Sequence, residues 1–494
     1  MITFIFVVFM IAIYLLAFKG YKRVDSAEDL IIANWNLPLP LVTWSLTAAL
    51  LAAPFYFAAV DSGYFLGGWE SFATMGGLGT AMIICAFTWV KPLRRLKGWT
   101  IADYYGIRFA DKKLGAYAGI IMIVAFGFFN AGALTVGGAY IIQVIFDIPF
   151  WASAIVFVIL TIVYTLMGGL WSLAYADVLN GIISVLGILT VTLVIIFTNQ
   201  GEIFNPNWWD VNRLFDQSGA DFWILYLVLA LGNLAAADLG QRVAGAKSPS
   251  IASKSMIIAG LIVLIVGWTP GIIGEAFKML YPGVENAESL LLLYPLDYWH
   301  PIFAGLFLTA MVGMAMSTLA ACYMAAVGVF AKNIYLDFIN KKPSQKKLLF
   351  YSRVAILVCG VVALYISISF EQVLAVAYLA WDIIFATLFW PLLLPPFWKG
   401  VSSKAVWSSI SAGLFVYVVT LFAGVPLPGE GGLLWTLLQE PVFFAVVISG
   451  IIIVVVSKLS PPNQATLDAH ARELDKTADE LPTEETFGGD KWVN

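Results

Sequence analysis

Charged side chains are scarce in this sequence: only 12% of its 494 residues are Asp, Glu, Lys or Arg, whereas 61% are hydrophobic. A soluble domain carries roughly 25% charged residues. A soluble fold needs a polar coat that this composition cannot supply, so a soluble globular protein is excluded. A lipid bilayer removes that need, and we therefore predict an all-α integral membrane protein.

Histidine and cysteine are also scarce, which removes most routes to catalysis. The two histidines, His300 and His470, lie near a span end and in the C-terminal tail, and the three cysteines lie in apolar stretches without metal-ligand spacing. An enzyme needs an acid, a base or a metal at its reacting centre. We therefore expect no enzyme and no organic cofactor, and the net charge of −4 gives no indication of a nucleic-acid partner.

Long apolar runs recur along the whole chain instead. A helix needs roughly 20 residues to cross the hydrocarbon of a bilayer. We place about thirteen such helices in a membrane domain, residues 1–458, and assign residues 459–494 to an acidic cytoplasmic tail that we expect to be mostly disordered. The expected spans are residues 2–18, 38–60, 72–90, 115–146, 149–167, 174–198, 222–240, 253–277, 300–332, 348–370, 372–397, 404–424 and 440–458.

The positions of Lys and Arg support these spans and suggest an orientation. With the N-terminus outside, all 27 Lys and Arg except Arg213 and Lys278 fall on the cytoplasmic side. The runs 115–146 and 300–332 are long enough for two helices each, but splitting either one would invert every later loop. We therefore keep each as one long helix, and we expect a multi-pass protein of the plasma (inner) membrane with a cytoplasmic C-terminus.

Two of the expected spans carry signals of a broken helix. The second has small residues followed by Pro54, and the seventh contains the run Gly232–Ala237, which forms helix poorly. The two spans lie five apart, which is typical of an inverted repeat of five helices with a binding site between the breaks. The alternative is tight helix packing through small residues.

Polar groups inside the spans mark candidate sites, because a charge in mid-bilayer costs about 2.5–3.5 kcal/mol on insertion scales. Asp177 and Asp382 are candidates for a functional or conformational role. Asp238 and Arg242, at i and i+4, read either as an intrahelical pair or as part of a site. The adjacent hydroxyls Ser317–Thr318 in the ninth span either bond back to the preceding turn or contribute to an oxygen cage for a monovalent cation.

Several segments, in this order, resemble the sodium:solute symporter family. They are Tyr164–Asp177, Gln241–Ser248, Met316–Leu319 and Ala331–Tyr335. Within the family, Lys91–Arg94, Tyr378–Asp382 and Trp398–Gly400 are most similar to the high-affinity choline transporter branch. The resemblance covers residues 1 to about 430. It implies a leucine-transporter-like fold, with a five-plus-five inverted repeat formed by spans two to eleven.

The resemblance also implies a mechanism and its ligands. Members take up a small organic solute by alternating access, coupled to sodium. The family's sodium site uses backbone carbonyls of two core helices and two hydroxyls. Carried over to this sequence, the site consists of the carbonyls of Ala48, Leu51 and Met314 and the side chains of Ser317 and Thr318, with Asp177 nearby.

The expected solute pocket differs from that of the choline branch, where aromatic rings enclose a quaternary ammonium. Two of the three matching positions hold Leu50 and Ala236, and the third falls near Phe128 or Phe129, so the aromatic cage is not retained. The candidates for the pocket, chosen by position, are Leu50, Phe55, Tyr56, Phe128, Asn130, Ala236, Asp238, Trp381 and Asp382.

Two functions follow from these observations. The first is a sodium-coupled secondary active symporter whose partners are a small organic solute, sodium ions and the lipid bilayer. The apolar pocket motivates the alternative, a transporter-like membrane solute sensor without sodium-driven transport. Accumulation of a solute against its gradient distinguishes the two.

Overall fold

The computed structural model describes residues 1–51, 53–198, 209–215, 219–370, 373–429 and 431–476. Across these residues all the named elements are helices. Nine of the described helices are long and apolar enough to cross a membrane, or up to eleven if each of two bent pairs is one span. This confirms the predicted all-α membrane protein. The number thirteen stays a prediction, compatible with a break inside α10 and a further, shorter apolar helix at 377–393.

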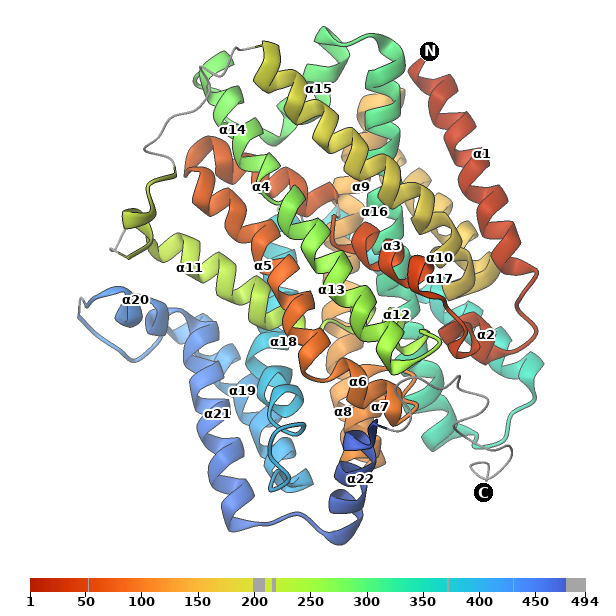
Figure 1. Cartoon of the computed structure of the whole chain (residues 1–494), viewed down its shortest axis with the longest axis vertical. Helices are drawn as coiled ribbons and strands as arrows, with labels where there is room; N and C mark the ends of the chain where they lie inside the picture. The colour runs from red at the N-terminus through yellow and green to blue at the C-terminus, as the bar shows by residue number, and fades with distance from the viewer. Residues whose placement is uncertain (52, 199–208, 216–218, 371–372, 430, 477–494) are drawn as a thin grey trace.

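The helices that make up the membrane domain follow one another along the chain in Figure 1. They are α1 (Ile2–Tyr21), α3 (Leu39–Leu50), α4 (Ala53–Phe65), α5 (Gly68–Phe87), α8 (Lys112–Met122), η2 (Ile123–Asn130), α9 (Ala131–Phe146), α10 (Phe150–Thr198), α11 (Ala220–Leu227), η6 (Val228–Gly232), η7 (Asn233–Ala235), α12 (Ala237–Ala244), α13 (Pro249–Val266), α14 (Thr269–Leu280), α16 (Pro301–Val329), η8 (Phe330–Ile339), α17 (Gln345–Ser369), α18 (Val373–Leu393), α19 (Ser403–Ala423) and α21 (Pro441–Leu459).

Short helices connect these spans or lie at their ends. They are α2 (Ala27–Ile32), η1 (Ala33–Trp35), α6 (Val90–Arg95), α7 (Ile101–Arg108), η4 (Val211–Phe215), α15 (Glu288–Tyr298), α20 (Leu433–Gln439) and α22 (Gln464–Leu474). The two long runs that we kept undivided, 115–146 and 300–332, fall within the continuous helices 112–146 and 301–339.

The predicted breaks occur in both expected spans, with one difference in detail. Helices α3 and α4 meet at 48°, and α11–η7 meets α12 at 44°. Pro54 lies in the first turn of α4, where its missing N–H is tolerated, so it begins a new helix and does not kink an existing one. The second break is at Ala236, which has an extended backbone between η7 and α12.

The fifth and sixth expected spans are joined more tightly than predicted. We expected helices over 149–167 and 174–198 with a loop between them, but α10 runs through both and is interrupted only at Gly168 and Gly169. Gly169 has φ +51°, and a side chain there would collide with the carbonyl of Leu30. Two glycines therefore replace the expected loop and allow α10 to pack closely against α2.

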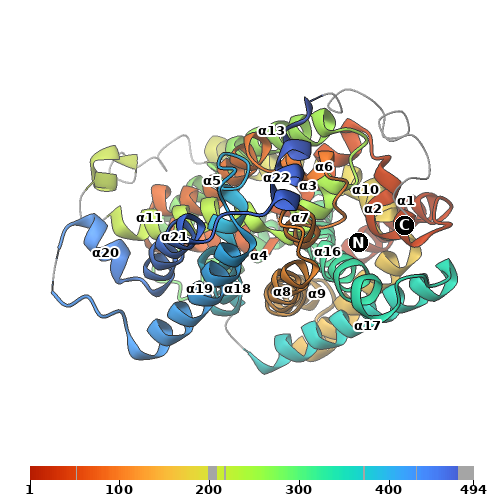
Figure 2. The same cartoon turned by 90° about the horizontal axis from the view of Figure 1, so that it is seen from below.

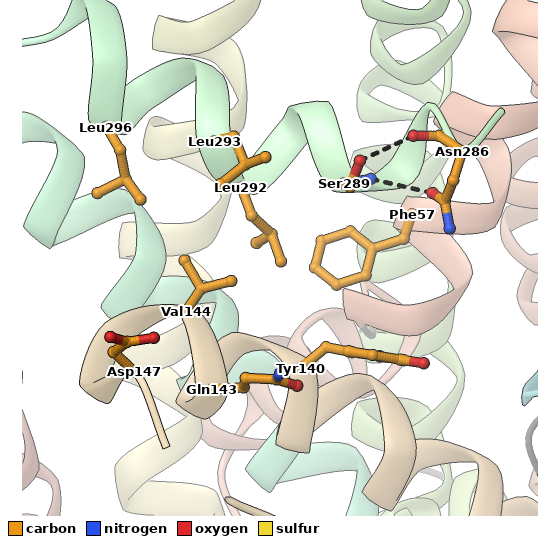
Figure 3. A pocket seen from close by; sticks show the side chains of 10 residues that line it. All are labelled: Phe57, Tyr140, Gln143, Val144, Asp147, Asn286, Ser289, Leu292, Leu293 and Leu296. Carbon is orange, nitrogen blue, oxygen red and sulfur yellow. Dashed lines mark hydrogen bonds between the residues drawn. The ribbon is translucent and has the colours of Figure 1, made fainter. Parts of the chain in front are cut away.

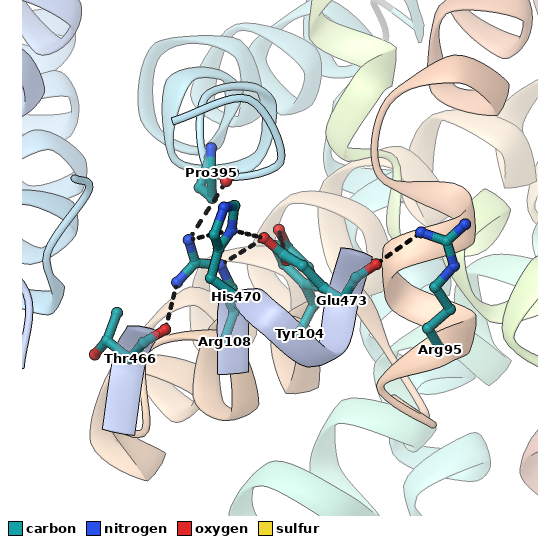
Figure 4. Close-up of polar contacts among 7 residues, drawn as sticks. All are labelled: Arg95, Tyr104, Arg108, Pro395, Thr466, His470 and Glu473. Carbon is teal, nitrogen blue, oxygen red and sulfur yellow. Dashed lines mark hydrogen bonds and ion pairs between the residues drawn. The ribbon is translucent and has the colours of Figure 1, made fainter. Parts of the chain in front are cut away.

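The expectation of a disordered tail from residue 459 is wrong for Gln464–Leu474, which forms α22. Both views place α22 against α6 and α7 (Figures 1 and 2), in agreement with its contacts. Glu473 is fully buried there and accepts hydrogen bonds from Arg108 Nε at 2.8 Å and from the Tyr104 hydroxyl at 2.9 Å (Figure 4). A polar segment is thus held by buried ionic contacts and not by an apolar face. Residues 477–494 lie outside the described residues.

Candidate functional site

Two hydroxyls of α16 lie where α3 ends. The Thr318 hydroxyl lies 2.9 Å from the carbonyl oxygen of Ala49 and 3.1 Å from that of Met314, so it joins the two helices. The neighbouring Ser317 hydroxyl is buried and has no hydrogen-bond partner within the described part of the chain. The last four carbonyls of a helix lack intrahelical partners. Oxygens that can accept a cation therefore gather at this junction.

The remaining residues of the expected sodium site belong to the same junction. Ala48 and Leu51 are fully buried at the C-terminal end of α3, on either side of Ala49, and Met314 lies one turn before Thr318 on α16. The contact at Ala49 was missed from the sequence because a carbonyl oxygen carries no residue-specific signal. The predicted helix break next to Ala49 was the sequence signal that pointed to free carbonyl oxygens at this position.

A buried charge network adjoins this junction. The Arg242 guanidinium lies 3.7 Å from a carboxylate oxygen of Asp177 on α10 and 3.7 Å from one of Asp238 on α12. Ser45 on α3 donates to Asp177 at 2.5 Å and accepts from Arg242 Nε at 2.9 Å. Arg242 also approaches the carbonyl of Ser317 at 3.4 Å. The i,i+4 pair of Asp238 and Arg242 is therefore present, but it belongs to a network that links four helices.

Aromatic rings meet on the α4 side of the break between α3 and α4. The Trp381 ring of α18 contacts the rings of Phe55 at 6.0 Å and Phe126 at 5.1 Å between centroids, both edge to face. Phe128, the expected pocket residue, instead lines a separate groove beside α17. Residues 123–130 form a π-helix, whose wider turn shifts the side-chain register and brings Phe126 to Trp381.

Other expected pocket residues have partners in neighbouring helices. The Tyr56 hydroxyl lies 2.7 Å from the Thr269 hydroxyl of α14, and Tyr417 of α19 donates to Asp382 at 3.0 Å. Leu50 and Ala236 are buried beside the two breaks. Asp382 therefore connects α18 to α19 in this conformation.

Several buried polar atoms near the breaks have no hydrogen-bond partner among the described residues. They are Oδ1 of Asn130, Oδ1 of Asp238, Nε1 of Trp381 and both amide atoms of Asn233. The amide nitrogen of Asn130 is bonded to the sulfur of Cys322 at 3.4 Å. Buried polar atoms without partners call for water, an ion or a ligand. These atoms provide both donors and acceptors.

A cavity of about 490 Å³ lies between α4, the C-terminal end of α9 and α15 (Figure 3). Phe57 enters it from α4, two residues beyond Phe55, and Tyr140 and Gln143 face it from α9. Its far wall is the leucine-rich face of α15. This helix was not predicted from the sequence, and its residues were treated as part of a loop. The cavity therefore lies beside α4, the helix that also carries Phe55 of the candidate site.

Similarity to known proteins is consistent with this architecture. The model of the sodium:solute symporter family matches residues 41–413. The chain is 24% identical to the human high affinity choline transporter 1 over 416 residues, which cover 80% of this chain and 71% of that protein. It is 25% identical to the Vibrio parahaemolyticus sodium/glucose cotransporter over 473 residues, covering 86% and 85%.

Solved structures agree on the fold. A substrate-bound, outward-open Na+-coupled sialic acid symporter superposes with a TM-score of 0.77 at 17% identity, covering 94% of this chain and 99% of the other. MhsT in complex with L-phenylalanine gives 0.53 at 15% identity, covering 85% and 98%. The expected leucine-transporter-like fold and the resemblance drawn from the motifs are thereby confirmed. Since the family match spans most of its length, the chain belongs to the sodium:solute symporter family.

Proposed function

We propose that the protein is a sodium-coupled secondary active symporter that takes up a small organic solute by alternating access. The observation that carries this proposal is the Thr318 hydroxyl, which sits between the carbonyls of Ala49 and Met314 at the end of α3. In transporters with broken helices, unwound carbonyls and helix C-terminal ends coordinate sodium. The ion would bind the carbonyls of Ala48, Leu51 and Met314 and the hydroxyls of Ser317 and Thr318.

The charge network favours a cation at this position. Asp177, Asp238 and Arg242 together carry a formal charge of −1, and all three side chains are almost fully buried. An uncompensated charge in a low-dielectric interior is costly. One bound sodium ion would balance the charge, and it would also hold α3 against α16. In this proposal a neutral or zwitterionic solute leaves the balance unchanged.

The solute would bind between the two broken helices and α18. Phe55, Phe126 and Trp381 provide apolar contact area, while Asn130 and Asp238 provide the polar atoms that lack partners. Such a pocket suits a small molecule with both an apolar part and hydrogen-bonding groups. Relatives are named for choline, glucose, pantothenate and proline, all small polar organic molecules. Leu50 and Ala236 would line the same space.

Solute would reach this pocket through the cavity between α4, α9 and α15 (Figure 3). We place this cavity outside, the N-terminus outside and the C-terminus in the cytoplasm of a cell whose plasma membrane holds the protein. One charge crossing 100 mV supplies about 2.3 kcal/mol, enough for roughly fiftyfold accumulation before the sodium gradient is added.

Thermal unfolding of the purified protein in sodium and in potassium at equal ionic strength tests the sodium site. A ligand present at about 100 times its dissociation constant stabilises the native state by roughly 2.7 kcal/mol. We expect a higher midpoint in sodium for the native protein and no difference for the Ser317→Ala, Thr318→Ala double variant. A sodium effect that persists in this variant would contradict the assigned ligands.

A matched control keeps the number of deleted hydroxyls constant. Thr161 on α10 and Thr309 on α16 are buried, and each hydroxyl donates to a carbonyl in the preceding turn of its own helix. The Thr161→Ala, Thr309→Ala variant should retain the sodium effect.

Uptake into proteoliposomes separates the symporter from the alternative, a membrane solute sensor. Solute binding without sodium-driven accumulation would favour the sensor.

A further inference from the structure

A second hollow lies outside the cavity described above. It is a groove of about 210 Å³ between η2, the end of α16 and α17. Ile123 and Phe128 form one wall, Phe330 begins η8 directly after α16, and Val358 comes from α17. Val358 is 50% exposed, so the groove opens to the outside of the helix bundle. Among membrane-spanning helices, the outside at this level is lipid.

A cluster of positive charge continues from one end of the groove. Tyr351, Val354 and Val358 line it from α17, and Lys347 precedes Tyr351 by four residues. Residues at i, i+4, i+7 and i+11 share one face of a helix, so Lys347 lies one turn beyond the groove on the same stripe.

The cations near this end are numerous and accessible. Residues 340–353 contain no Asp or Glu, and four lysines in this segment are exposed: Lys341, Lys342, Lys346 and Lys347. Arg353 follows Lys347 by six residues on α17 and adds a fifth positive charge to this part of the chain. The end of the groove is therefore rich in donors for an anion.

We propose that the groove and the adjoining lysines form a binding site for one anionic phospholipid. An acyl chain would lie in the apolar groove, and the phosphate headgroup would face Lys346 and Lys347. Clusters of basic residues at the end of a membrane helix attract acidic lipids, at about 1 kcal/mol per side chain. The tyrosines Tyr335 and Tyr351, with ring centroids 5.0 Å apart, lie where an interfacial aromatic is favourable.

The site is positioned to affect transport. Ala326 and Phe330 line the groove, and Ala326 lies eight residues beyond Thr318 on the same helix α16. The opposite wall is the π-helix η2, which also carries Phe126 to Trp381. A lipid in this groove would therefore brace the two elements that carry the sodium ligands and the aromatic contact.

Lipid retention measures this site without reference to transport. The full chain would be placed in nanodiscs of equal phosphatidylglycerol and phosphatidylcholine, and the lipid retained after gentle extraction counted by mass spectrometry. We expect enrichment of phosphatidylglycerol on the native protein. The Lys346→Gln, Lys347→Gln variant should lose roughly 25-fold in this preference, since each basic side chain contributes about fivefold.

Two controls make the result decisive. The Lys399→Gln, Lys404→Gln variant removes the same charge from exposed lysines near α19 and should keep the preference. Val358→Trp fills the groove and should abolish retention with all lysines present, whereas Val419→Trp, on the exposed face of α19, should not. Equal retention by Val358→Trp and the native protein, or equal loss from both lysine pairs, would overturn the proposal in favour of a general surface charge effect.

Discussion

At the scale of single residues, the buried charges are the most sensitive feature of the molecule. Arg242 is the partner of two carboxylates, each 3.7 Å away. Removing one member of a buried ion pair typically costs about 3–5 kcal/mol, because the other charge is left without compensation. We therefore expect Arg242→Met to lower the thermal midpoint strongly, or to reduce the folded yield, even without sodium.

The double variant Arg242→Met, Asp238→Asn provides the control for this prediction. It removes one carboxylate together with the cation, so part of the lost stability should return. The comparison is made by thermal unfolding in potassium, where the proposed sodium site does not contribute. If Arg242→Met alone unfolds at the native midpoint, the network does not stabilise the fold.

The residues of the proposed sodium site were predictable from the sequence to the extent that they carry side-chain chemistry. Ser317 and Thr318 stood out as hydroxyls in an apolar helix, and the structure places Thr318 at the end of α3. Phe128 was chosen from the family resemblance, which falls near Phe128 or Phe129, and the structure places its side chain in the groove beside α17. The sequence carries no marker for the π-helix η2, so the side-chain register of residues 123–130 could not be predicted from it.

At the scale of the elements, apolar length and small-residue runs predicted an all-helical membrane protein and both bends. Those signals act through helix propensity and backbone hydrogen bonding, which are local. The helix α22 depends on partners far along the chain, since the buried Glu473 side chain contacts Arg108 and Tyr104 of α7. Its amphipathic polar sequence resembles a solvated tail, so local reasoning could not identify it.

The docking of α22 gives a prediction at this scale. Glu473→Gln should weaken the contact with Arg108, which is 2.8 Å away and equally buried (Figure 4). We expect residues 464–474 to exchange their amide hydrogens faster, while α10 and α16 keep their protection. The exposed Asp468 provides a matched control: Asp468→Asn also converts an acid to an amide but should leave the exchange unchanged. Equal protection of α22 in both variants would contradict a role for the ion pair.

At the scale of the whole molecule, family membership establishes a transporter and not an enzyme, and the charge distribution along the loops remains the argument for its orientation. All but two of the Lys and Arg fall on one predicted side. The same asymmetry requires an odd number of crossings between the N-terminus and the segment 340–347. One labelling experiment therefore tests both orientation and span count.

Single cysteines at Glu285, between α14 and α15, and at Lys342, between η8 and α17, are exposed positions for this experiment. The native Cys85, Cys322 and Cys359 are buried, so the background labelling by a membrane-impermeant maleimide should be low. In intact cells we expect Glu285→Cys to react at once and Lys342→Cys only after permeabilisation. The reverse pattern would invert the orientation. Reaction of both positions from outside would require an additional crossing between them, which the continuous helix 301–339 does not allow.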